Sequence, residues 1–188
     1  MNCITAFSSN ATPLFRAGVK TGSFLRGSGL GFVLSMILGL SAPHAVAATT
    51  WQSSDIGDVG APGSANGTND SLIVAGAGAD IYAEADAFQF AYQPWNGDGE
   101  IVARISRLED INPWSKAGLM FRGSLEANSA NVFIFMTPEN GVGIQSRTNT
   151  GGSTDFSPAT FVTPPAWLKL VGRASTAVGL PVGSVRSA

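Results

Sequence analysis

The sequence predicts an all-β protein built as a sandwich of two antiparallel sheets. Three observations predict this fold. From Trp51 onward the apolar runs alternate with a period of two, and none of them has a helical period. Stretches rich in Gly, Asn, Asp and Pro separate these runs at short intervals, as turns do. About seven short strands without helices bury their apolar faces by packing one sheet against another.

Each predicted strand is a run of about five to eight residues. In chain order the runs are Leu72–Ala75, Phe88–Tyr92, Ile101–Ser106, Lys116–Arg122, Val132–Met136, Val142–Arg147 and Trp167–Val171. In the fourth run, Leu119 and Phe121 alternate with Met120 and Arg122. The fifth run is apolar on both faces, which predicts a central strand that is covered on each side.

Turn residues lie between these runs. Asn96-Gly97-Asp98-Gly99 and Pro138-Glu139-Asn140-Gly141 contain residues that tolerate positive φ, so both are predicted to close hairpins. Oxygen atoms in the first of these turns resemble a calcium site only superficially, because a hairpin accounts for every residue. No metal site and no cofactor are therefore predicted. After Arg173 the alternation ends, and residues 174–188 contain no acidic and no aromatic residue. This segment is expected to be an irregular tail, either a disordered end or the product of a truncated or frame-shifted reading frame.

Residues 1–47 have the pattern of a bacterial secretory signal peptide. Arg16, Lys20 and Arg26 precede the apolar run Leu30–Leu40, and a small-x-small motif follows at Ala45-Val46-Ala47. The run is about half as long as a membrane-spanning helix of roughly 20 residues, so a retained anchor is the less favoured alternative. We therefore expect a secreted or periplasmic protein with no membrane span after signal removal, folded over residues 48–173.

The composition of the exported chain excludes several classes of chemistry. The only cysteine, Cys3, and the only histidine, His44, both lie in the predicted signal. Catalytic triads, cysteine nucleophiles, His/Cys zinc sites and disulfides are thus not expected. Without Arg16, Lys20 and Arg26 the chain keeps eight basic against 13 acidic residues, and this net negative charge disfavours a nucleic-acid partner. About 140 residues are enough for one domain with a proper core.

The motif Asn112-Pro113-Trp114-Ser115-Lys116-Ala117-Gly118-Leu119-Met120-Phe121-Arg122 resembles a domain of many secreted bacterial proteins. This is the concanavalin A-like lectin/glucanase sandwich, also called a regulation-of-enolase or DUF1349-like module. The similarity extends from about Trp51 to Leu170 and implies a jelly-roll sandwich. Members of the superfamily include hydrolases, lectins and attachment modules, so the resemblance specifies fold more than function. Strands that usually follow the Trp-Leu-Lys-Leu run do not follow Arg173, which implies that one or two final strands are missing.

The acidic residues do not form a glycosidase pattern. Glucanases of this class resemble one another in a Glu-x-Asp-x-Glu strand, and this chain contains no such triplet. Glu84 and Asp86 would share a face of an extended strand, which leaves a glycoside hydrolase as a third and least favoured hypothesis. No catalytic residue is predicted, and the protein is not expected to be an enzyme.

Polar side chains on neighbouring predicted strands are the candidate binding site. Lys116 and Arg122 share one strand face, Gln145 and Arg147 share another, and Arg104 lies on a third. If these strands adjoin, their polar faces line a shallow groove in which these side chains bind sugar hydroxyls, while Trp114 or Trp95 supplies a stacking surface. The alternative is that they are the ordinary wet positions of a half-buried sheet. The candidate ligand-binding residues are Arg104, Trp114, Lys116, Arg122, Gln145 and Arg147.

These observations favour an exported, non-catalytic β-sandwich module that binds a polysaccharide or a cell-surface glycan. A structural or adhesion module without a small-molecule site is the main alternative, together with a non-functional remnant of a longer gene.

Overall fold

The protein is all-β, as the sequence predicts. A computed structural model describes residues 2–7, 15–21, 51–68, 70–95, 97–172 and 183–185, with backbone alone for the first two ranges and the last. The strands are β1 (Asn2–Phe7), β2 (Phe15–Thr21), β3 (Gln52–Ile56), β4 (Ser64–Thr68), β5 (Ser71–Ala75), β6 (Ile81–Tyr82), β7 (Ala85–Asp86), β8 (Phe88–Gln93), β9 (Gly99–Ile105), β10 (Lys116–Arg122), β11 (Asn131–Met136), β12 (Val142–Arg147), β13 (Asp155–Thr160), β14 (Ala166–Gly172) and β15 (Gly183–Val185).

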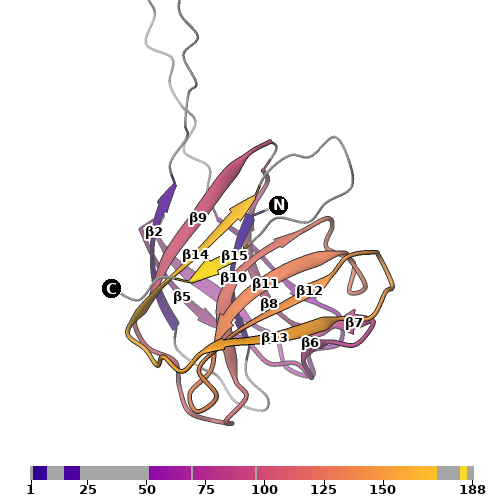
Figure 1. Cartoon of the computed structure of the whole chain (residues 1–188). Helices are drawn as coiled ribbons and strands as arrows, with labels where there is room; N and C mark the ends of the chain where they lie inside the picture. Colours follow the sequence, from indigo (N-terminus) through magenta and orange to yellow (C-terminus); the bar gives the residue numbers. More distant parts are fainter. Residues whose placement is uncertain are drawn as a thin grey trace, which may run out of the picture.

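The strands form two main antiparallel sheets that pack face to face (Figure 1). Sheet A has the order β13-β12-β11-β10-β1-β8-β3, and sheet B has the order β15-β14-β9-β2-β5-β4. A separate short hairpin joins β6 to β7. Across the core, β9 and β14 of sheet B lie against β10, and β14 also contacts β11. The sandwich is therefore confirmed, with β10 and β11 at its centre.

The core between the sheets consists of the alternating apolar residues that the sequence pattern selected. Sheet B contributes residues such as Val74, Ile105 and Leu168, and sheet A contributes Leu119 and Ile134, all with no exposed surface. Burying a side chain of this size stabilises the fold by about 1.5–3 kcal/mol relative to leaving it in water. Every residue of β11 is buried, so the predicted central strand covered on both faces is confirmed.

The outer face of sheet A is also covered, which the sequence analysis did not anticipate. Phe88, Phe90, Met120 and Phe133 form a second apolar cluster on this face. Ile81 of the β6–β7 hairpin packs on it, and so do Leu125 and Ala127 of the loop after β10. Six of the seven residues of β10 are consequently buried. The two faces of β10 alternate as predicted, but its polar face is not a wet surface.

The two predicted hairpin turns differ in the structure. The turn at Pro138–Gly141 joins β11 to β12, which pair directly, and Gly141 has a φ of 70° as such a turn requires. The turn at residues 96–99 instead connects β8 in sheet A to β9 in sheet B, so it is not a hairpin. Gly97 still has a positive φ of 86°. The turn residues identified where the chain changes direction. Which sheet β9 joins depends instead on its partner strands, which lie far away in the sequence.

Strands also lie within the two end segments, residues 1–47 and 174–188. Both β1 and β2 lie within the predicted signal segment, yet each pairs on both sides, β1 with β10 and β8, and β2 with β9 and β5. The apolar run 30–40, the cleavage motif and His44 lie outside the described residues, so signal cleavage stays a prediction. Within the predicted irregular tail, β15 pairs with the outer edge of β14.

Candidate functional site

A cavity of about 210 Å³ opens on the outer face of sheet A. Its lining comes from the chain before and within the β6–β7 hairpin, from the loop before β10, and from β10 to β13. The residues are Asp80, Tyr82, Trp114, Lys116, Phe135, Gln145 and Phe156. Trp114, Lys116 and Gln145 are candidate binding residues from the sequence, and the fold brings these three together.

Aromatic side chains supply much of the wall. Phe135 and Phe156 are stacked with ring centroids 6.2 Å apart, and Trp114 meets Phe156 edge to face at 6.3 Å. Phe135 is buried, whereas Trp114, Tyr82 and Phe156 each leave between 41% and 48% of their surface exposed. Large apolar rings held at the surface are favourable places for a ligand to bury area.

Hydrogen bonds hold Trp114 in place. Its backbone N–H donates to Oδ1 of Asn112 at 2.8 Å, and the N–H of Ser115 donates to the carbonyl of Asn112 at 2.8 Å. Nδ2 of Asn140, in the β11–β12 turn, donates to the carbonyl of Pro113 at 2.8 Å. This loop is thus fixed by a turn of its own and by a second loop, which positions the backbone that carries the indole.

The cavity has few polar groups, and these differ in how fully their atoms are hydrogen-bonded. Nζ of Lys116 donates to Oδ1 of Asp80, and it lies 5.4 Å from the centroid of the Phe135 ring. The backbone N–H of Ile81 donates to the same Asp80 oxygen at 2.6 Å. Gln145 is 3% exposed, and its Oε1 has no hydrogen-bond partner among the described residues. A buried acceptor without a donor costs about 1–3 kcal/mol, which a ligand hydroxyl aimed at it would recover.

Gly143 on β12 allows the two stacked phenyl rings to meet. A Cβ at this position would lie 2.7 Å from Cζ of Phe135 and 2.8 Å from Cε2 of Phe156. Any larger residue therefore has to displace one of the rings. The shape of the cavity floor depends on the absence of a side chain here.

Arg122 and Arg147 do not reach the cavity, and the expectation that they bind ligand in an open groove is wrong. Both side chains are 0% exposed. Nη1 of Arg122 donates to Oδ2 of Asp86 at 3.1 Å, and Nη2 of Arg147 donates to Oδ1 of the same carboxylate at 2.7 Å. We call Asp86, Arg122, Arg147 and Asn131, whose Nδ2 also donates to Asp86, the buried ion cluster.

The remaining arginine donors of the buried ion cluster bind backbone carbonyls of the elements that cover sheet A. Arg122 donates to the carbonyls of Ser124 and Glu126, each at 2.6 Å. Arg147 donates to the carbonyls of Tyr82, Ala83 and Ser129 at 3.1–3.2 Å. The cluster thus fastens the β6–β7 hairpin and the loop after β10 onto the sheet, and so positions the Tyr82 side of the cavity.

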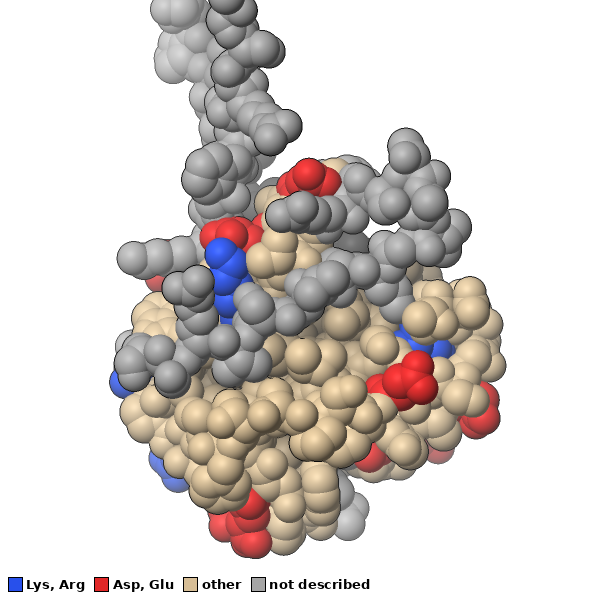
Figure 2. Space-filling model, viewed as in Figure 1, with Lys and Arg blue, Asp and Glu red and all other residues tan. Residues whose placement is uncertain are grey.

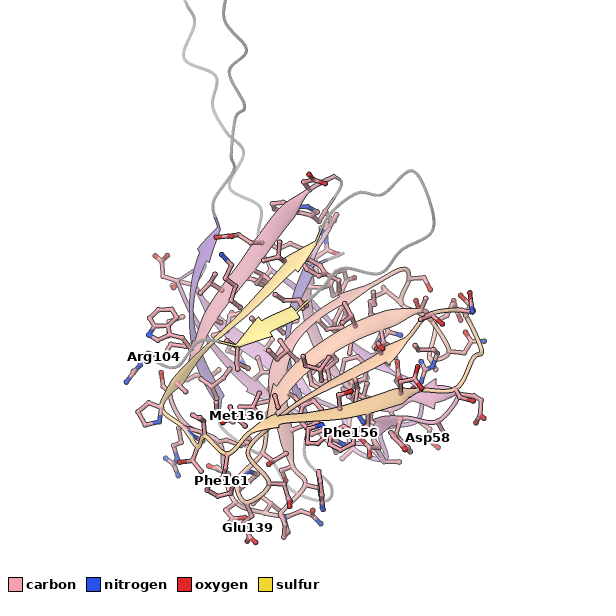
Figure 3. All side chains as sticks on the ribbon, in the orientation of Figure 1. Asp58, Arg104, Met136, Glu139, Phe156 and Phe161 are labelled. Carbon is pink, nitrogen blue, oxygen red and sulfur yellow. The ribbon has the colours of Figure 1, made fainter. Side chains whose placement is uncertain are left out.

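Other candidates from the sequence lie elsewhere. Arg104 is exposed on β9 of sheet B, and Figure 3 shows it well apart from Phe156. Trp95 stays near its own turn, where Nε1 donates to the carbonyl of Gly97 at 3.1 Å. Glu84 is exposed in the β6–β7 turn, while Asp86 is buried in the ion cluster, so they do not share the strand face expected of a carboxylate pair.

Four lining residues escaped the sequence analysis. Tyr82 belongs to a hairpin too short to show alternation, and Asp80 directly precedes that hairpin. Phe156 lies on β13, whose residues are all exposed and lack an apolar stripe. Phe135 was recognised only as part of a central strand. The one local signal was an isolated Phe in a Ser- and Thr-rich stretch at residues 153–160.

Charge and ligating groups add little to this site. No cluster of three His, Cys, Asp or Glu side chains that could hold a metal occurs within the described residues. On the face shown in Figure 2, charged side chains are scattered over a largely uncharged surface.

The described part of the chain also contains no helix with the length and apolar character needed to cross a membrane.

Comparisons of the chain with protein-family models, with curated proteins and with solved structures find no match. The concanavalin A-like resemblance therefore stays an interpretation of the motif around Trp114, and the case for function depends on the cavity itself.

Proposed function

We propose that the protein is a non-catalytic β-sandwich module that binds a glycan in the cavity lined by Trp114, Phe156 and Gln145. The observation that carries this proposal is the combination of exposed aromatic rings with buried Gln145, whose Oε1 has no hydrogen-bond partner in the part of the chain that the structure describes. Sugar rings present apolar C–H faces and hydroxyl donors together, so they satisfy both kinds of group.

The polar groups favour a sugar over a purely apolar ligand. An apolar molecule would cover Gln145 and leave its acceptor without a donor, which costs free energy. The Asp80 side chain is 40% exposed, and within the described residues its second oxygen, Oδ2, accepts no hydrogen bond. Two acceptors beside aromatic walls suit a ligand with several hydroxyl groups.

The size of the cavity favours a short ligand segment. Pockets that enclose drug-sized molecules measure roughly 300–1,000 Å³. At about 210 Å³ the cavity is smaller, so it suits one sugar residue, with the rest of the chain lying across Trp114. A terminal or branching residue of a polysaccharide fits this description better than a long buried stretch.

A polysaccharide array with the full chain, followed by titration calorimetry on any glycan bound, tests the proposal. Trp114→Ala should lower affinity at least tenfold, or about 1.4 kcal/mol, without changing the unfolding midpoint. Arg104→Ala, outside the cavity, is the matched control and should bind like the parent. No binding to any glycan, or equal losses in both variants, would favour a structural module instead.

The predicted signal peptide supports action outside the cytoplasm, in the periplasm or after secretion. N-terminal sequencing of exported protein tests this part separately, because a chain that still starts at Met1 would contradict cleavage after Ala47 or Ala48.

A further inference from the structure

The two N-terminal strands occupy interior positions in the sandwich. In sheet A, β1 lies between β8 and β10, with Cys3 opposite Tyr92 on one side and opposite Met120 on the other. In sheet B, β2 lies between β9 and β5, with Ala17 opposite Ile105 and Leu72. Neither β8 and β10 nor β9 and β5 pair with each other.

Removing these strands would open both sheets in the middle. Sheet A would divide into β13-β12-β11-β10 and β8-β3, and sheet B into β15-β14-β9 and β5-β4. The exposed edges would belong to well-buried strands, because five of six residues of β8 and six of seven of β10 are buried. Backbone groups in such places need hydrogen-bond partners, and open apolar edges recruit other strands.

We propose that the gaps between β8 and β10 and between β9 and β5 are strand-acceptor sites, which the chain fills with its own residues 2–7 and 15–21. Main-chain hydrogen bonds provide the recognition, as in other cases where an extended peptide adds to a sheet. The predicted cleavage after Ala47 would remove the covalent link to both strands, and the processed chain would then take the same segment in trans. The acceptor sites depend on backbone pairing, binding in trans depends also on the predicted cleavage, and both are independent of glycan binding.

Cys3, the only cysteine of the chain, permits a register-specific test in the full-length protein. Tyr92→Cys and Met120→Cys each place a second thiol directly opposite Cys3, one on β8 and one on β10. Opposite residues of antiparallel strands have the Cα separation that a disulfide needs, whereas the next residue along faces the other side of the sheet. Ala91→Cys, opposite Ile4, and Ala117→Cys, opposite Ala6, are the matched controls.

After mild oxidation, we expect an intramolecular cross-link in the position 92 and 120 variants, seen by peptide mass spectrometry, and none in the controls. Absence of the cross-link in both variants, or equal cross-linking in the controls, would overturn the proposal.

Nicking the folded chain tests exchange of the strands. A protease site introduced at Gly29 and cut after folding should leave the N-terminal fragment bound to the rest of the chain in gel filtration. An excess of labelled synthetic peptide 1–21 should then replace that fragment. Separate elution of the fragment, or failure of the labelled peptide to enter the complex, would overturn the proposal without affecting the glycan assignment.

Discussion

Two ion pairs join strand β10 to the segment at residues 80–86, and they differ in burial and in the role we assign to them. Lys116 at the start of β10 binds Asp80, and Arg122 at its end binds Asp86 in β7. Each pair is 36 residues apart in sequence. The Asp86–Arg122 pair is 0% exposed, whereas Asp80 keeps 40% of its side chain exposed at the edge of the cavity.

The difference lies in how completely the carboxylates are satisfied. Asp86 accepts from two arginines and from Asn131, and both of its oxygens are used. Within the described residues Asp80 accepts hydrogen bonds on one oxygen only, and the buried acceptor of Gln145, which lines the same cavity, has no partner there. A buried carboxylate with both oxygens bonded stabilises and positions, while a partly satisfied one next to aromatic rings keeps capacity for a ligand.

The largest effect is expected for Asp86→Ala. This change leaves two buried guanidinium groups without their carboxylate and should lower the free energy of unfolding by about 3–5 kcal/mol. Urea unfolding followed by tryptophan fluorescence measures it. Glu84→Ala, two residues away in the exposed turn, is the control and should behave like the parent. An Asp86→Ala variant as stable as the parent would show that the buried ion cluster does not hold the hairpin.

A smaller effect on stability, about 1–3 kcal/mol, is expected for Gly143→Ala because the added methyl group displaces Phe135 or Phe156. The same displacement should abolish glycan binding in calorimetry. Gly123→Ala is the control, since its nearest neighbour, Oγ of Ser129, would be 3.4 Å from the new Cβ. Unchanged binding by Gly143→Ala would mean that the stacked rings do not contact the ligand.

Asp80→Asn tests whether Asp80 contributes to glycan binding more than to stability, in contrast to Asp86. Only Asp80 of this pair is partly exposed, because the Lys116 side chain is 4% exposed. The buried ammonium loses its counter-charge but can still donate to the amide oxygen, so the loss in stability should be about 1–2 kcal/mol. Glycan affinity should nevertheless fall, because an amide presents one acceptor where the carboxylate presents two. Thermal unfolding and calorimetry on the same sample separate the two effects. A large loss of stability would place Asp80 with Asp86 as a structural residue.

The smallest effect is expected for Arg104→Ala. This exposed side chain on sheet B should change the free energy of unfolding by less than about 0.5 kcal/mol. A clear loss of glycan binding would move the site to the other sheet and contradict the cavity assignment.

The sequence alone determined the fold class, seven of the 15 strands among the described residues, and the faces of β10. Alternation of apolar residues has the same period as the strand itself, so it identifies strands and shows which residues share a face. The sequence also indicated Trp114, Lys116 and Gln145 as binding residues, and the fold places all three around one cavity. It missed β4, β13 and the β6–β7 hairpin, because largely exposed strands and two-residue strands have no apolar alternation to detect. It also assigned the residues of β1, β2 and β15 to a signal segment and an irregular tail.

Only the tertiary structure decided what covers each face. Lys116 and Arg122 occupy equivalent places in the pattern of β10, yet one borders a cavity and the other is sealed under the loop at residues 124–130. The choice of sheet for β9 and the interior places of β1 and β2 were decided in the same way. Periodicity is a property of one strand, whereas burial and pairing depend on segments far away in the chain, whose packing no local pattern encodes.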